Sequence, residues 1–205
     1  MGRVGSCPRT SRAPPPGSRR PPAPVVAQVG AGPFVADRPR RSESERERLR
    51  RISILNARLP RKRTIAQGVL RNPEGQVLLC ELSYKKEWDL PGGVVDPGES
   101  PATCVEREVE EELGIQVAAG RLLAVNWLPP WRGWDDALLY LFDLGRHDTG
   151  ELDPSLFLRR EIAGAHWRSV ADAGAHVAPY TARMLEVAHD AEHTAYLENS
   201  EPAAG

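Results

Sequence analysis

One stretch constrains the fold of this chain more than any other: residues 93–115, GVVDPGESPATCVEREVEEELGI. Its segment 96–99, DPGE, places proline and glycine at the two central positions of a type II turn. Ser100 is a good helix N-cap, and Pro101 suits the first helical position, where a missing N–H costs nothing. A glycine near the end of the stretch is typical of the residue that ends a helix. The stretch therefore predicts a turn followed by a helix over residues 101–113.

The predicted helix has one apolar face and one acidic face. Its apolar residues recur at helical spacing and should face a core: Ala102, Val105, Val109 and Leu113. At about 100° per residue, Glu108, Glu111 and Glu112 share an arc of about 100°, so their carboxylates point the same way. A run of glutamates is often only a solvated face. Beside a turn, however, a compact carboxylate cluster suits Mg²⁺, which prefers a few oxygen ligands together with water and substrate phosphate.

The same stretch resembles the signature of the Nudix hydrolases, G-x5-E-x7-R-E-U-x-E-E-x-G-U, in which U is aliphatic. Every defined position of that signature is matched between residues 93 and 115. The preceding residues 88–93, WDLPGG, are similar to the aromatic-x-x-Pro-Gly-Gly that often precedes it in the family. The resemblance covers about residues 63–192. It implies an α/β fold, the Nudix α/β/α sandwich, in which a mixed sheet lies between helices.

The resemblance also implies a reaction and its residues. The reaction is metal-assisted hydrolysis of a phosphoanhydride bond in a nucleotide, with Mg²⁺ or Mn²⁺ as cofactor. The implied metal ligands are Glu108, Glu111, Glu112 and the carbonyl of Gly92. The implied catalytic residues are Glu99, Arg107, Glu108, Glu111 and Glu161. Glu99 and Arg107 resemble the family's ion pair between loop and helix, and Glu108, Glu111 or Glu161 would act as the base.

Glu161 is assigned by its spacing from a tryptophan. It lies six residues before Trp167, and MutT-like members of the family carry a metal-facing glutamate at that spacing. A glutamate at the start of a strand is otherwise usually a surface residue.

A tryptophan-rich loop follows the strand that we expect over residues 116–128. Residues 129–136 read PPWRGWDD, in which Trp131, Arg132 and Trp134 would bind substrate by stacking on a base and contacting a phosphate. The alternative is that these tryptophans pack in the core. Pro130 follows the Nudix signature by fifteen residues, a spacing associated in the family with ADP-ribose pyrophosphatases.

Charge and composition separate the N-terminal part from the rest. Residues 1–63 carry 16 Lys and Arg against 4 Asp and Glu, whereas residues 64–205 carry 11 against 24. Residues 1–41 are rich in Pro, Arg and Gly, a composition that predicts disorder. We expect a disordered tail (1–41), an amphipathic helix with a basic linker (42–62), the Nudix domain (63–192) and a C-terminal tail (193–205).

The remaining elements follow from periodicity. The expected strands are 64–71 and 76–83, which form a hairpin, and 116–128, 137–144 and 161–168; the expected helices are 43–58 and 179 to about 197. The helix over 43–58 would dock its apolar residues on the domain or on a partner.

The sequence favours a nucleoside diphosphate derivative as substrate, with ADP-ribose or a nucleotide sugar first. MutT-like cleavage of (deoxy)nucleoside triphosphates, including oxidised ones, is the main alternative. A non-catalytic nucleotide-binding module and an RNA-end processing enzyme are weaker alternatives. Three cysteines without paired spacing suit a reducing cytoplasm, and no apolar run approaches a membrane span. We expect a cytoplasmic monomer or homodimer with a small nucleotide as partner and neither a membrane nor a nucleic acid.

Overall fold

The computed structural model describes residues 43–148, 150, 152–190 and 192–203. The tail expected over 1–41 lies outside these residues. The chain divides into two units, Met1–Ala57 and Arg58–Gly205. Helix α1 (Glu43–Arg58) confirms the helix expected over residues 43–58, and its apolar side chains Leu49, Ile52 and Leu55 are exposed. Its expected docking stays a prediction.

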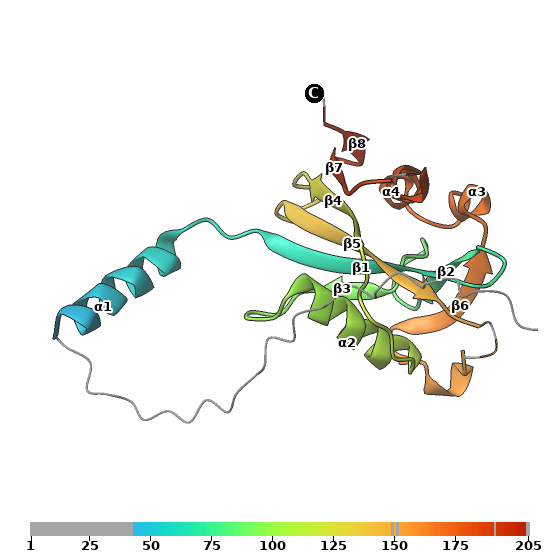
Figure 1. Ribbon diagram of the computed structural model, residues 1–205, viewed down its shortest axis with the longest axis horizontal. Coiled ribbons are helices and arrows are strands. Elements are labelled where there is room, and N and C mark those ends of the chain that lie inside the picture. Colours follow the sequence, from blue (N-terminus) through green and yellow to red (C-terminus); the bar gives the residue numbers. More distant parts are fainter. Residues whose placement is uncertain (1–42, 149, 151, 191, 204–205) are drawn as a thin grey trace, which may run out of the picture. The chain divides into compact units, whose positions relative to one another are not determined.

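The second unit is built on one mixed eight-stranded sheet (Figure 1). Its strands are β1 (Arg63–Arg71), β2 (Val77–Leu82), β3 (Gly92–Val94), β4 (Leu122–Leu128), β5 (Ala137–Arg146), β6 (Ile162–Arg168), β7 (Ala195–Glu198) and β8 (Glu201–Pro202). The order is β6-β2-β1-β5-β4-β7-β8, and β3 also pairs with β1. The β1–β5 and β4–β7 pairs are parallel, and the other pairs are antiparallel.

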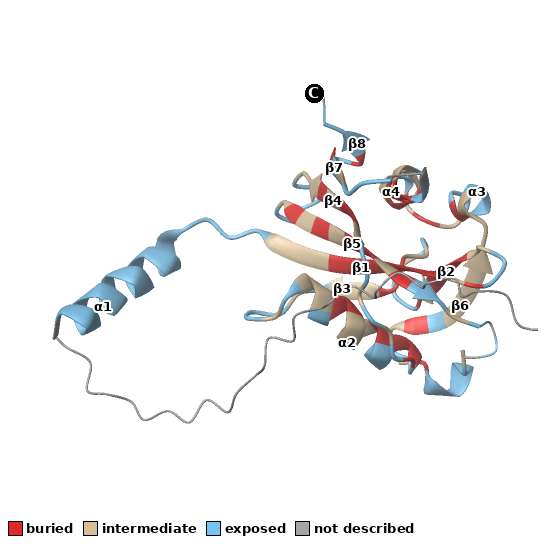
Figure 2. Cartoon of the chain, in the orientation of Figure 1, coloured by how far each residue is buried: buried red, intermediate tan, exposed pale blue. Residues whose placement is uncertain are grey.

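Helices cover both faces of this sheet. α2 (Pro101–Leu113) lies on one face with η2 (Pro154–Leu156), and α3 (Val170–Ala173) and α4 (Pro179–Asp190) lie on the other (Figure 1). Alternate strand residues feed two cores, so in β1 Leu70 packs toward α2 whereas Val69 packs toward α4. The buried side chains concentrate along the central strands and the inner side of α2 (Figure 2). The α/β/α expectation is therefore confirmed.

The local chemistry predicted for α2 is also present. The Ser100 hydroxyl accepts a hydrogen bond from the Thr103 N–H at 3.1 Å, as an N-cap does. Gly114, at φ 72°, donates its N–H to the Glu110 carbonyl and ends the helix. In the preceding turn the Glu99 N–H donates to the Asp96 carbonyl at 3.0 Å. The apolar stripe faces the core, where Val105, Val109 and Leu113 are buried.

Two of the expected boundaries are wrong. The strand expected over 116–128 begins only at Leu122, because Ala119 donates its N–H to the Glu106 carboxylate and Gly120 donates to Asp143 rather than to a continuous ladder. The helix expected from 179 to about 197 ends at Asp190. Residues 195–198 instead form β7, where Leu197 is fully buried against the sheet.

Among the residues that the structure describes, none of the helices is both long and apolar enough to cross a membrane.

Candidate functional site

Two consecutive glycines, Gly92 and Gly93, let helix α2 approach the sheet closely. At Gly92, with φ 131°, a Cβ atom would lie 2.2 Å from the Ala66 carbonyl oxygen. At Gly93 a Cβ atom would lie 2.6 Å from the carboxylate carbon of Glu108. Only glycine fits at position 92, where a side chain would meet the backbone, and at position 93 the Glu108 carboxylate fills the space that the missing side chain leaves.

Glu112 is the buried member of the carboxylate group. It is 6% exposed, and its carboxylate accepts a hydrogen bond from the Gly92 N–H at 3.2 Å. Burial, and to a smaller extent the nearby charges of Glu108 and Glu161, raise the pKa of Glu112 to about 8 against the opposing Gly92 hydrogen bond. Burial likewise raises the pKa of Glu108. The protein around these two carboxyl groups therefore disfavours their ionised forms.

Arg107 ties the turn to the helix. Its guanidinium donates to both carboxylate oxygens of Glu99, at 2.9 and 3.1 Å, so the expected ion pair is present. The same guanidinium lies 3.0 Å from Glu108 and 3.3 Å from Glu111. The hydrogen bond from Arg107 is the main reason that the pKa of Glu99 falls to about 2, and the Asp96 N–H adds to it. A permanently charged pair therefore fixes the turn on the helix.

Glu161 reaches the same region from another part of the chain. It immediately precedes β6, and its carbonyl accepts a hydrogen bond from the Ser83 N–H at 2.8 Å. Its carboxylate pairs with Arg160 at 2.9 Å. Its charge acts on both Glu108 and Glu112, so the structure brings it within electrostatic range of the Nudix helix.

These residues suit a divalent cation by their chemistry. The donors are carboxylate oxygens, which Mg²⁺ and Mn²⁺ prefer, and a cation would stabilise the ionised form of Glu112 that burial and the neighbouring carboxylates disfavour. In the described part of the chain, however, no three His, Cys, Asp or Glu side chains converge as a metal-binding group. One reason is that Glu111 turns toward Arg107 and is 56% exposed. The roles of Glu108, Glu111, Glu112 and Gly92 as ligands stay predictions.

The tryptophan-rich loop forms a tight hairpin. Trp131 and Trp134 exchange backbone hydrogen bonds at 3.0 and 2.9 Å, across Arg132 and Gly133, which both have positive φ. The two indoles are 63% and 62% exposed, so they do not pack in the core. Trp127 is half-buried and donates its indole N–H to Asp136 at 3.1 Å.

An arginine covers each exposed indole of this hairpin. The Arg132 guanidinium lies 4.3 Å from the Trp131 ring, and the Arg63 guanidinium lies 4.7 Å from the Trp134 ring. Arg63 begins β1, and the carbonyl of the next residue, Thr64, accepts a hydrogen bond from the N–H of Val95, in the loop between β3 and α2. The hairpin and this loop therefore meet at the start of β1.

Sequence reasoning missed a polar group beside Gly92. Asp89 receives hydrogen bonds from Gln67 at 2.9 Å and Lys85 at 2.6 Å. A signal existed, since Gln67 is a polar residue in the middle of the apolar strand β1. Periodicity alone could not place Lys85 and Asp89 next to it, because the loop 83–91 has no regular structure that fixes its path.

Comparison with known proteins fits this geometry. The sequence profile described as the NUDIX domain matches residues 61–190. The nucleoside triphosphatase NudI of Salmonella agona is 34% identical over 93 residues, which cover 43% of this chain and 61% of that protein. The 8-oxo-dGTP diphosphatase of Haemophilus influenzae is 40% identical over 55 residues, or 25% of this chain and 40% of that protein. This chain therefore spans about three fifths or less of these relatives.

Solved structures share the fold. The MutT protein of Methanosarcina mazei Go1 has a TM-score of 0.53 and 26% identity, covering 64% of this chain and 96% of that one. A UDP-X diphosphatase has a TM-score of 0.56 and 18% identity, covering 74% of each chain, and shows the fold alone. With the profile matched over more than half of its length and the Nudix turn and helix in place, this chain belongs to the Nudix hydrolase family.

Proposed function

We propose that this chain is a Mg²⁺-dependent hydrolase that cleaves a phosphoanhydride bond of a nucleoside triphosphate. The observation that carries the proposal is the carboxylate group of α2, which packs against Gly92 and Gly93 and in which burial raises the pKa of Glu112 to about 8. The relatives with 34% and 40% identity are a nucleoside triphosphatase and an 8-oxo-dGTP diphosphatase. These names favour a triphosphate over the ADP-ribose that the sequence alone puts first.

The chain's own residues divide the work. Glu108, Glu111, Glu112 and the Gly92 carbonyl would hold Mg²⁺, for which Mn²⁺ could substitute. When bound, the cation neutralises phosphate charge and lowers the pKa of a coordinated water. Glu161, which acts electrostatically on two of these glutamates, or one of Glu108 and Glu111 accepts the proton of the attacking water. Glu99 and Arg107 hold the turn on the helix that carries the three glutamates.

The exposed hairpin binds the substrate. Trp131 and Trp134 present open indole faces, and Arg132 adds a cation for a phosphate. The partner is a small nucleotide, and the chain acts as a monomer or a homodimer.

ADP-ribose or a nucleotide sugar is the second candidate. Pro130, at its family spacing from the Nudix signature, lies in the loop that carries the exposed tryptophans. The two candidates differ in the leaving group and not in the metal chemistry.

One substrate panel separates these candidates. With Mg²⁺, we expect kcat/KM for at least one nucleoside triphosphate to exceed that for ADP-ribose and UDP-sugars by tenfold or more. A tenfold preference for ADP-ribose would favour the second candidate. Absence of hydrolysis with every compound would contradict the proposed activity itself.

A matched pair of variants tests the metal role. Glu111→Gln should lower kcat by about a hundredfold or more with saturating Mg²⁺, with little change in Tm, because it removes a repelling charge from the group. Glu110→Gln is the control, since Glu110 is the exposed neighbour whose carboxylate accepts only from Gln116 in the described structure. A Glu111→Gln variant that keeps more than about a tenth of wild-type kcat would remove Glu111 from the metal site.

A further inference from the structure

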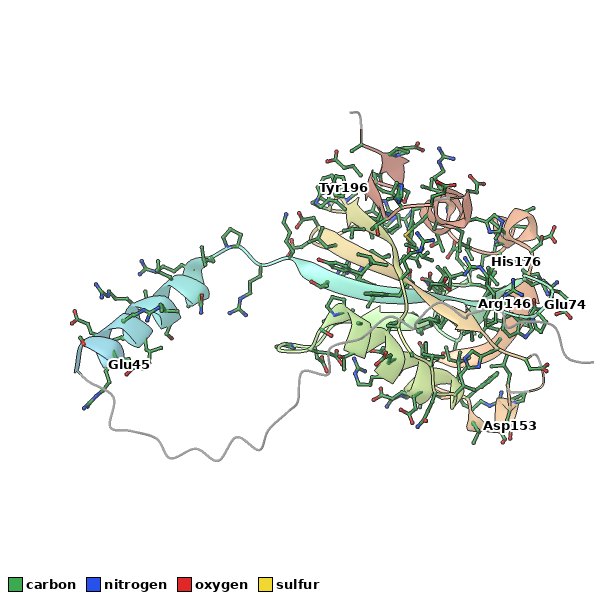
Figure 3. The ribbon with its side chains drawn as sticks, in the orientation of Figure 1. Glu45, Glu74, Arg146, Asp153, His176 and Tyr196 are labelled. Carbon is green, nitrogen blue, oxygen red and sulfur yellow. The ribbon has the colours of Figure 1, made fainter. Side chains whose placement is uncertain are left out.

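The turn between η2 and β6 is attached directly to the last turn of helix α2. The Leu158 N–H donates to the backbone carbonyl of Glu112 at 3.0 Å, and the Leu158 carbonyl accepts from the Glu161 N–H at 2.8 Å. Figure 3 shows Asp153, the residue that caps η2, on the α2 side of the sheet. The backbone of residues 158–161 is therefore held against Glu112, whose side chain belongs to the candidate metal site.

The other side of this turn is held by the residue that follows β2. Ser83 donates its N–H to the Glu161 carbonyl at 2.8 Å and its hydroxyl to the Arg160 carbonyl at 2.5 Å. One residue thus binds two adjacent carbonyls, in addition to the contact with α2. Because the backbone is held from both sides, the directions in which the side chains of Arg160 and Glu161 leave it are fixed as well.

Two neighbouring arginines leave this turn toward different partners. Arg159 donates through Nη2 to the Pro154 carbonyl at 2.7 Å, so its guanidinium lies at η2. Arg160 donates through Nε to the Glu161 carboxylate at 2.9 Å, and its side chain is 77% exposed. The same type of side chain is therefore directed to η2 at one position and to a carboxylate of the candidate site at the next.

The Arg160 guanidinium keeps a pair of donors that the protein does not use. Its Nε donates to Glu161, whereas neither Nη1 nor Nη2 has a hydrogen-bond partner among the described residues. Two N–H groups in this fork match two oxygens of one phosphate. The arginine of α2, Arg107, is in contrast already paired with three carboxylates.

The Glu161 carboxylate links Arg160 to the candidate metal site. Its charge acts on both Glu108 and Glu112, and Arg160 lies directly on it. A triphosphate adds negative charge beside a group of carboxylates, so its binding requires positive charge besides that of the metal. A guanidinium that is already hydrogen-bonded to Glu161 supplies such a charge with one of its nitrogens held in place.

We propose that Arg160 binds a phosphate group of the substrate through Nη1 and Nη2 while its Nε keeps donating to Glu161. The inference rests on the proposed function, because it assigns a phosphate contact to the site that cleaves the nucleotide. Arg160 is then a substrate-binding residue, and toward Glu161 it is a positioning residue that holds the carboxylate beside the phosphate. The contact depends on the phosphate chain and not on the base.

Binding of a probe without a base tests this contact apart from hydrolysis. Methylenediphosphonate resembles pyrophosphate, and its P–C–P link cannot be hydrolysed. In calorimetry with Mg²⁺, Arg160→Ala should raise the Kd of this probe by about tenfold, because a hydrogen bond between charged groups is lost. Arg159→Ala removes the same charge one residue away and should keep the Kd within about twofold. Arg160→Lys keeps the charge but not the fork of donors, so its Kd should be intermediate.

Three results would overturn the phosphate contact. They are the absence of measurable methylenediphosphonate binding to the wild-type protein with Mg²⁺, a Kd within twofold of wild type in Arg160→Ala, and equal increases of Kd in Arg159→Ala and Arg160→Ala. The last result would mean that the probe responds only to the summed positive charge of the turn. Both arginines are exposed, so each variant should keep the wild-type Tm within about 2 °C, which separates lost binding from unfolding.

Steady-state kinetics tests the positioning of Glu161. Arg160→Ala should raise KM for the preferred triphosphate and lower kcat, whereas Glu161→Gln should lower kcat alone. If Arg160 acts on kcat through Glu161, the variant with both changes should have the kcat of Glu161→Gln and the methylenediphosphonate Kd of Arg160→Ala. Losses in kcat that multiply, or an unchanged kcat in Glu161→Gln, would refute the positioning role.

The outcomes also separate this inference from the proposed function. Methylenediphosphonate binding that depends on Arg160, without hydrolysis of any nucleotide, would leave the phosphate contact intact and refute the activity. Hydrolysis of a triphosphate with unchanged kcat and KM in Arg160→Ala would leave the activity intact and refute the contact.

Discussion

The pKa values of two glutamates in the Nudix stretch are shifted in opposite directions because the surroundings of the two side chains differ. The pKa of Glu99 falls to about 2, since Arg107 and the Asp96 N–H donate to its carboxylate. The pKa of Glu112 rises to about 8, since burial removes its water and other carboxylates surround it. Glu99 thus stays ionised and holds the turn, whereas the ionised form of Glu112 is disfavoured and would be stabilised by a cation.

The raised pKa of Glu112 predicts how stability depends on pH in the absence of metal. The pKa of about 8 in the folded state lies above the ordinary value of 4.5, so protonation favours the folded state. This contribution is fully present below about 4.5 and is lost as pH rises through about 8. Glu112→Gln should therefore have a higher Tm than the wild-type protein at pH 9 in EDTA, by at least about 3 °C.

The same variant has a built-in control at low pH. At pH 4.5 the wild-type carboxyl is protonated, so the two proteins should melt within about 1 °C of each other. Glu110→Gln, on the exposed side of α2, should change Tm little at either pH. An unchanged difference between pH 4.5 and pH 9 would show that Glu112 does not titrate as its burial requires.

The close contact at Gly93 predicts that a substitution there lowers activity without unfolding the protein. An alanine Cβ there would lie 2.6 Å from the Glu108 carboxylate carbon, so the flexible end of Glu108 must move away. Gly93→Ala should lower kcat by about tenfold or more while the protein still folds, because a 1 Å misplacement can cost about a hundredfold. Gly150→Ala, where nothing lies within 4 Å, is the control, and equal kcat in the two variants would exclude a role for this contact.

At the scale of elements, the sequence predicts those helices and strands whose first and last residues are of types that begin or end such elements. Helix α2 begins and ends where its serine, proline and glycine require. The end of α4 is not predicted, because no glycine or proline lies between Asp190 and Glu201 and the apolar residues of 195–198 continue a helical pattern. Only the pairing of Ala195 with Ala124 in β4, a contact distant in sequence, makes that segment a strand.

The hairpin of residues 129–136 makes a prediction about substrate binding. Trp131 is 63% exposed and has Arg132 on its ring. If a base stacks there, Trp131→Ala should raise KM by the factor that corresponds to a lost binding free energy on the order of 1–3 kcal/mol. It should leave kcat nearly unchanged, because stacking stabilises the ground state and the transition state alike.

A conservative change provides the control for this prediction. Trp131→Phe keeps an aromatic face on the same hairpin and should recover most of the lost affinity. A KM that rises equally in both variants would mean that the hairpin backbone, and not the ring, was disturbed. An unchanged KM in Trp131→Ala would remove the hairpin from the substrate site.

Across the whole molecule, the candidate site is predictable from the sequence where its residues share one helix, and not where residues from separate segments meet. Glu108, Glu111 and Glu112 lie on one face because of helical geometry alone. Gln67, Lys85 and Asp89 come from β1 and from an irregular loop whose path depends on the stacking of Trp88 on His166 and His176. Spacing in sequence carries no information about that meeting, so the polar group needed the three-dimensional structure.

The division of the chain into two units predicts that the second is self-sufficient. Every buried apolar side chain among the described residues lies between Ala66 and Leu197, so the core of the second unit is complete without residues before Arg58. The basic, proline-rich composition of residues 1–41 cannot supply further core. A chain that begins at Arg58 should therefore match the full-length protein in Tm within about 2 °C and in kcat/KM within about twofold. A chain that begins at residue 42 should give the same values. If only the shorter chain lost stability or activity, helix α1 would be part of the working domain; if both did, the basic tail would be.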